Sequence, residues 1–264
     1  MVKTKGHKKH RNHKMKHGKD YQEKPTHGKP LGRKDFAAAK TVKDKFIYDE
    51  NFTDPTSLGN HFEGDINLNL SEALGNDYSL APQMAKRKNA IRNPEGRWPN
   101  GVIPYVISEE YTEEERAVLA NAMNEYHEKT CIKFVPRTDQ EDYISIESQE
   151  GCHSMVGRTR GPQVVSLQRG SCVFTGVVIH EIMHATGFFH EQSRADRDEF
   201  VEVLWDNIEP RMQDNFQKHD LGMIDHLGAK YDLCSIMHYG LNLFAKVGII
   251  CVTFMPPIFL RPLD

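Results

Sequence analysis

The stretch that decides the fold of this chain reads His180-Glu-Ile-Met-His-Ala-Thr-Gly-Phe-Phe-His190. Apolar residues before and within it predict a buried helix. His180 and His184 are four residues apart, so both imidazoles project from one face of that helix and can share a metal ion. Gly187 can adopt a positive φ, which ends the helix and lets the chain return His190 as a third ligand.

These three histidines, with a glutamate beside the first, predict a catalytic zinc site. Three neutral imidazoles leave one coordination position open, which is typical of catalytic rather than structural zinc. Glu181 can reach a water at the metal without binding the metal itself. The alternative is a set of histidines satisfied inside an apolar core. We disfavour it because three imidazoles beside a carboxylate are costly to bury without a metal.

The residues before this stretch predict a layer of strands with a helix packed on it. Apolar runs predict strands at 102–107, 132–135, 143–146 and 164–167. Thr112 and Glu115 form a capping-box pattern, which opens a helix that ends near Thr130. A strand, a helix and three further strands indicate an α+β fold.

Five other motifs accompany the zinc motif along the chain. They are Phe62-Glu-Gly-Asp-Ile66, Trp98-Pro-Asn-Gly-Val-Ile-Pro-Tyr105, Cys131-Ile-Lys-Phe-Val-Pro-Arg137, His190-Glu-Gln-Ser-Arg-Ala-Asp-Arg-Asp198 and Ser235-Ile-Met-His-Tyr239. With them, residues 62–240 resemble the astacin family of metzincin zinc endopeptidases. The resemblance implies a zincin-like α+β domain with a twisted mixed sheet, an active-site helix and a Met-turn below the zinc.

The resemblance also implies the roles of the site residues. His180, His184 and His190 would hold one zinc ion per subunit. Glu181 would act as general base on the attacking water. Tyr239 would be a displaceable zinc ligand that swings away and hydrogen-bonds the developing oxyanion. The implied substrates are proteins or peptides bound in an extended conformation.

Three further residues carry implied supporting roles. Asp65 would bind the zinc in the latent form of the enzyme; the alternative is an ordinary turn aspartate after a glycine. Met237 would pack beneath the metal without touching it. A protease would activate the enzyme by cutting after Lys88, and Glu191 would then receive the new terminal ammonium.

The five cysteines form no CxxC pair, which argues against a cysteine zinc finger or a thioredoxin motif. The resemblance implies a disulfide between Cys152 and Cys172. It also implies a partner for Cys131 near the C-terminus of the domain, for which Cys234 and Cys251 are the candidates. An odd count leaves at least one thiol without an intramolecular partner.

The formal net charge of −3 is distributed unevenly along the chain. Residues 1–46 hold 15 Lys and Arg against 4 Asp and Glu, whereas the remainder holds 19 against 33. We therefore expect a basic, His- and Lys-rich disordered tail over 1–34, a propeptide over 35–88 and a catalytic domain over 89–264. The acidic remainder excludes a nucleic-acid-binding domain throughout, and no specific nucleic-acid partner is expected.

Two alternative functions remain open at this stage. Residues 247–257 do not resemble the family, so we expect the C-terminal part of the domain to be incomplete. This raises the alternative of an inactive astacin-like protein that acts by binding partners. The basic tail raises a second alternative, a polyanion-binding protein.

No apolar run reaches the length of about 20 residues that spans a bilayer, so no membrane span is expected. The first residues show no apolar segment typical of a secretory signal. The expectation of a secreted, extracellular protein therefore rests on the resemblance alone.

Overall fold

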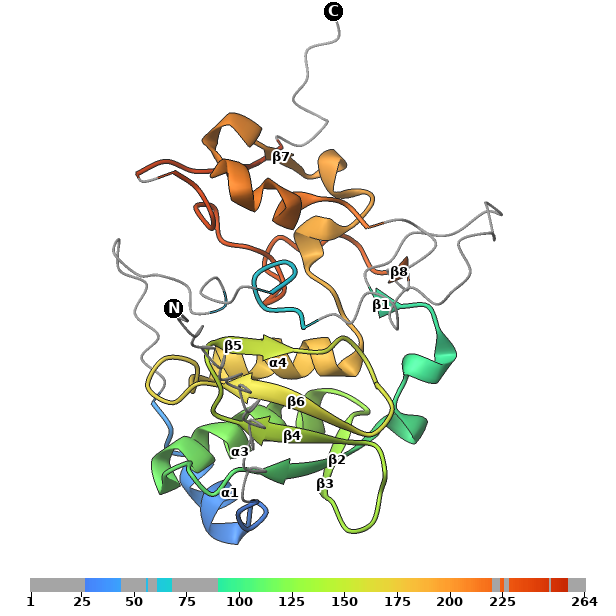
Figure 1. Ribbon diagram of the computed structural model, residues 1–264, viewed down its shortest axis with the longest axis vertical. Coiled ribbons are helices and arrows are strands. Elements are labelled where there is room, and N and C mark those ends of the chain that lie inside the picture. Colours follow the sequence, from blue (N-terminus) through green and yellow to red (C-terminus); the bar gives the residue numbers. More distant parts are fainter. Residues whose placement is uncertain are drawn as a thin grey trace, which may run out of the picture.

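The computed structural model describes residues 27–43, 56, 61–67, 90–219, 224–225, 228–246 and 248–255. They form two lobes with a short segment between them (Figure 1). The lower lobe holds the main sheet and the long helices, and the upper lobe is built mostly of turns. Residues 61–67, drawn in cyan, lie between the two lobes. Within this described part of the chain, no helix has the length and hydropathy required of a membrane span.

The main sheet has five strands in the order β3-β2-β4-β6-β5, all parallel except the edge strand β5. The inner strands β2 and β4 are buried along most of their length, because helices cover the sheet. The bounds are β2 Val102–Ile107, β3 Lys133–Pro136, β4 Tyr143–Glu147, β5 Cys152–Ser154 and β6 Pro162–Leu167. The mixed α+β sheet is confirmed, although β5 has no counterpart among the predicted strands.

Two helices pack together on this sheet, α3 Glu113–Lys129 and α4 Thr175–Thr186. The predicted capping box opens α3. The Thr112 hydroxyl accepts a bond from the Glu115 amide (3.2 Å), and the Glu115 carboxylate accepts one from the Thr112 amide (2.8 Å). The shared core includes side chains of both helices and of the inner strands.

A third helix, α1 Arg33–Ala39, corrects the expectation of disorder up to residue 34. It packs against α3, and the Asp35 carboxylate lies 3.1 Å from the Arg116 guanidinium. Leu31 is buried just before the helix. Ordered structure therefore begins by residue 27, and the expected boundary at 34 falls inside α1. Residues 1–26 lie outside the described residues.

The upper lobe has its own small core. β7 Val201–Val203 pairs antiparallel with β9 Val252–Phe254. The C-terminal stretch that was expected to be foreign to the domain therefore packs into this lobe, with Cys251 buried.

The remaining short elements are a two-stranded sheet and several 3-10 turns. β1 Ala90–Ile91 pairs with β8 Ile224–Asp225. The 3-10 turns are Pro94–Gly96, Pro99–Gly101, Glu191–Ser193, Arg197–Glu199, Trp205–Asn207 and Pro210–Phe216.

The disulfide between Cys152 and Cys172 is present and joins the edge strand β5 to the loop before α4. The other three cysteines are free thiols: Cys131 and Cys234 are exposed and Cys251 is buried. Neither candidate partner for Cys131 is bonded to it.

Candidate metal centre

Helix α4 carries the first two histidines, and its position is fixed by buried side chains of other elements. The indole of Trp98 donates a 2.8 Å hydrogen bond to the carbonyl of Ala185. The Tyr126 hydroxyl, from α3, donates one of 2.8 Å to the carbonyl of Ile179. These two bonds fix the position of the helix and, with it, the position of His180.

Gly187 ends α4 as the sequence predicted. Its φ is +113°, and a Cβ at this position would lie 2.9 Å from Cγ1 of Ile91. Conformation and space thus both require glycine here. The chain turns at this point and brings His190 back to the other two histidines.

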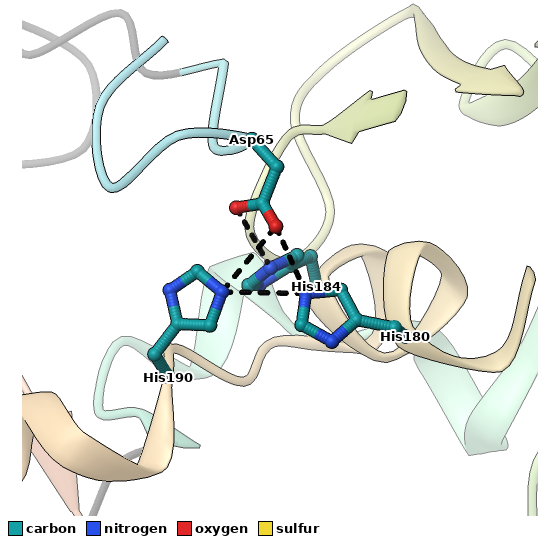
Figure 2. A group of neighbouring side chains, drawn as sticks. All are labelled: Asp65, His180, His184 and His190. Atoms are coloured by element: carbon teal, nitrogen blue, oxygen red, sulfur yellow. Dashed lines mark hydrogen bonds and ion pairs between the residues drawn. The ribbon is translucent and has the colours of Figure 1, made fainter. Parts of the chain in front are cut away.

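The three histidines meet around the carboxylate of Asp65 (Figure 2). Asp65 Oδ2 lies 3.0 Å from Nε2 of His180 and 3.4 Å from Nε2 of His190. Asp65 Oδ1 lies 3.4 Å from Nε2 of His184. All four side chains are buried, and their potential ligand atoms lie within 4.8 Å of one another.

The opposite ring nitrogen of each histidine is already bonded. In each case Nδ1 donates to an oxygen: the carbonyls of Ile236 (2.8 Å) and Phe188 (2.7 Å) and the carboxylate of Glu63 (2.7 Å). These bonds occupy Nδ1 of each ring, so Nε2 is the ring nitrogen that faces the centre and can bind a metal. Three imidazole nitrogens and one carboxylate oxygen form a donor set that zinc prefers, so the residues fit the implied metal.

The carboxylates set the charge state of the centre. Burial would raise the pKa of Asp65, but the electrostatic attraction of His190 and His184 and the contact with His180 hold it well below its usual range. Burial would likewise lower the pKa of His190, but Asp65 and Glu63 raise it to about 10. For His184 burial prevails and lowers the pKa to about 4. The site therefore attracts a positive charge, which a metal ion also supplies.

The two residues predicted to support the metal centre are bonded to each other. Met237 is fully buried, and its carbonyl oxygen accepts a 2.7 Å bond from the amide of Glu191. The Glu191 carboxylate accepts bonds of 3.0 Å from the Arg194 guanidinium and from the Asp232 amide. Glu181 is fully buried on α4, next to the first ligand.

Tyr239 contacts the segment that covers the metal centre. Its hydroxyl donates a 2.6 Å hydrogen bond to the carbonyl oxygen of Glu63, and its ring centroid lies 4.7 Å from that of His190. A cavity of about 450 Å³ opens beside His180 and Tyr239. Apolar side chains, including Leu233 and Phe254, line much of its wall.

Glu63 is the functional residue that the sequence reasoning missed. Its carboxylate is buried, accepts hydrogen bonds from His190 Nδ1 (2.7 Å) and Ser193 Oγ (2.5 Å), and lies 2.9 Å from His219 Nε2. Burial opposes its ionisation, but the two histidines lower its pKa to about 2. The residue stands inside the Phe62–Ile66 motif, yet no local pattern reveals partners that are so distant in sequence.

The residues that follow the expected activating cut contact the turn between the second and third histidines. The Ile91 amide donates a 2.8 Å bond to the Gly187 carbonyl, and Ala90 bridges to Phe188. Lys88, where the cut is expected, lies outside the described residues. The structure therefore shows where Ala90 and Ile91 lie, whereas the expected cleavage site is outside the described residues.

Comparison with known proteins gives one consistent family. The sequence model of the Astacin peptidase family matches residues 90–256. Zinc metalloproteinase nas-4 of Caenorhabditis elegans is 47% identical over 197 residues, which cover 74% of this chain and 60% of that protein. The low choriolytic enzyme of Oryzias latipes is 43% identical over 186 residues, 68% of this chain and 67% of that enzyme.

A solved structure agrees with the sequence comparisons. It is high choriolytic enzyme 1, a hatching enzyme zinc-protease from Oryzias latipes. It aligns with a TM-score of 0.60 and 44% identity over 64% of this chain and 87% of that one. The chain spans about three fifths of the length of the nematode relative.

Proposed function

Because the chain belongs to the astacin family of peptidases, we propose that it is a zinc-dependent endopeptidase made in a latent form. The observation that carries the proposal is the convergence of three buried imidazole Nε2 atoms whose Nδ1 atoms are all occupied. Its substrates are proteins or peptides bound in an extended conformation across the metal centre.

His180, His184 and His190 hold the zinc, which supplies Lewis-acid activation of a water and of the scissile carbonyl when bound. Glu181 takes the proton of the attacking water and then delivers it to the leaving amine. Its burial next to the first ligand supports this role, because bulk solvent would not compete for the carboxylate once a metal is bound. Tyr239 donates a hydrogen bond to the oxyanion.

Asp65 keeps the uncut enzyme inactive. Its carboxylate fills the position that a water needs in order to react, and bonds between the segment and the catalytic domain hold it there. The Asn67 amide donates to the Ser154 carbonyl (2.8 Å), and the Ser154 amide donates to the Asp65 carbonyl (2.9 Å). These bonds to edge strand β5 support the proposal that the segment stays bound until the chain is cut.

An activating protease would cut after Lys88. The new terminus would lie beside β1, whose residues already contact the turn between the second and third histidines. Glu191 would receive its ammonium. That carboxylate already bonds to Arg194 and to the Asp232 amide, so the ammonium would join an existing charged network.

We further propose that the protein is secreted. The disulfide between Cys152 and Cys172 supports this location, since such bonds persist in oxidising compartments. The alternative of an inactive binding protein is not favoured, because the family match extends to residue 256. No observation favours the polyanion-binding alternative, which rests on residues 1–34.

The test is zinc content and peptide hydrolysis measured on the same samples. We expect the chain cut after Lys88 to bind one zinc and to hydrolyse a quenched fluorescent peptide. Glu181→Gln should retain the zinc but lose activity by at least about 100-fold, because the glutamate is a base and not a ligand. Glu128→Gln, an exposed glutamate of α3, is the matched control. Full activity of Glu181→Gln with zinc bound would refute the assigned mechanism.

A further inference from the structure

The Glu63 carboxylate lies in a pocket that the catalytic domain builds from its own residues. Two donors bond to it, His190 Nδ1 and Ser193 Oγ, and His219 Nε2 lies 2.9 Å away; none of the three belongs to the segment that Glu63 comes from. One carboxylate oxygen accepts from His190, and the other accepts from Ser193 and lies next to the His219 ring. Glu63 is only 1% exposed, so solvent supplies little of this stabilisation.

Bonds within the catalytic domain hold the donors in place. The Ser193 amide donates to the His190 carbonyl (3.3 Å), and the His219 amide donates to the Ser193 carbonyl (2.8 Å). The His219 ring packs on Phe189 with centroids 4.5 Å apart. These three residues are therefore oriented by contacts that do not involve Glu63.

The backbone of Glu63 indicates that its side chain anchors the segment. Its φ is +49°, a left-handed conformation that glutamate rarely adopts. Such a conformation persists where surrounding contacts over-determine it. Here the contacts are the two hydrogen bonds to the carboxylate, its close approach to the His219 ring and the bond from Tyr239 to the backbone carbonyl.

We propose that His190, Ser193 and His219 form a carboxylate-binding site of the catalytic domain, distinct from the metal position. Glu63 fills it in the latent chain. Without a carboxylate, the two donors, His190 Nδ1 and Ser193 Oγ, would lose their acceptor and the His219 ring its ion-pair partner, so the site selects an acceptor with two oxygens and a negative charge. A neutral amide of the same shape meets this need only in part.

The first experiment measures hydrogen exchange of the amides of Ile66 and Asn67 in the uncut, zinc-loaded chain. These amides are bonded to Phe62 and Ser154, so they exchange when the segment opens. Glu63→Gln and Ser193→Ala should each accelerate exchange about ten-fold or more. Combining them should add little beyond either alone, because both break the same interaction. Glu128→Gln should leave exchange unchanged.

The second experiment tests the ligand class with a chemical probe. In the uncut chain with Glu63→Ala, sodium acetate should restore slow exchange, whereas acetamide or sodium chloride at the same concentration should not. Unchanged exchange in Glu63→Gln and Ser193→Ala, additive effects of the two, or equal rescue by acetamide would each overturn the proposal. The readout needs no peptidase activity, so these results stand apart from a failure of the proposed function.

Discussion

The hydroxyl of Tyr239 donates a hydrogen bond of 2.6 Å to the carbonyl oxygen of Glu63, two residues from the carboxylate at the metal centre. The residue expected to stabilise the oxyanion is thus bonded to the segment that carries Asp65. Departure of that segment would release two groups at once, the metal position and the tyrosine hydroxyl.

Tyr239→Phe should therefore lower kcat of the cut chain by about 100-fold, with a smaller change in KM, because one donor to the transition state is lost. Zinc content should not change. Steady-state kinetics on a quenched peptide measure the effect, and Tyr143→Phe, on strand β4, is the control. Wild-type kcat in Tyr239→Phe would show that the hydroxyl does not act on the oxyanion.

The disulfide should contribute to stability by constraining the unfolded chain. Cys152 and Cys172 are separated by 20 residues, so replacing both with serine should lower the free energy of unfolding by about 3 kcal/mol. Urea unfolding measures the loss. Cys131→Ser, which removes an exposed free thiol, should have little effect and serves as the control. Equal stability of all three proteins would contradict a structural role for the bond.

The three free thiols should differ in their reactivity. Cys131 and Cys234 are exposed, whereas Cys251 is buried, and burial raises its pKa to about 11. Because the thiolate is the reactive form, iodoacetamide at pH 8 should label the first two long before the third.

Peptide mass spectrometry of timed samples follows each cysteine separately. In urea, all three should be labelled at similar rates, which controls for intrinsic differences. Rapid labelling of Cys251 in the folded chain would show that β9 does not shield it.

The parts of the fold that sequence predicted are those encoded locally. The spacing of His180 and His184 follows from the helical repeat, and the capping box of Thr112 needs only a neighbour three residues away. Gly187 ends α4 because glycine readily adopts a positive φ, which is also a local property. These features depend on backbone geometry that a few adjacent residues determine.

The features that sequence missed depend on distant contacts or on atypical composition. Glu63 meets His190 and Ser193 across 127 and 130 residues, so nothing near it marks its role. Helix α1 lies next to a Lys- and His-rich stretch and owes its place to packing against α3. Strand β5 is short and lacks β-branched residues, so pairing with β6 defines it rather than propensity.

The last prediction concerns latency. Asp65 lies 3.0 to 3.4 Å from Nε2 of all three histidines, and we propose that its carboxylate takes the place of the reacting water. The uncut wild-type chain should therefore be inactive on a quenched peptide although its catalytic residues are complete. Cutting after Lys88 should release activity, because the segment no longer benefits from the high effective concentration of a tethered ligand.

Uncut Asp65→Ala separates the role of the carboxylate from that of the segment. Its activity should fall between the two other samples, because Glu63 and the bonds to β5 still hold the segment over the metal centre. Uncut Asp54→Ala, which changes an aspartate outside the motif, should stay as inactive as wild type. All samples must carry equal zinc, since a difference in metal content would mimic inhibition. Equal activity of uncut wild type, uncut Asp65→Ala and cut wild type would mean that Asp65 is an ordinary turn residue.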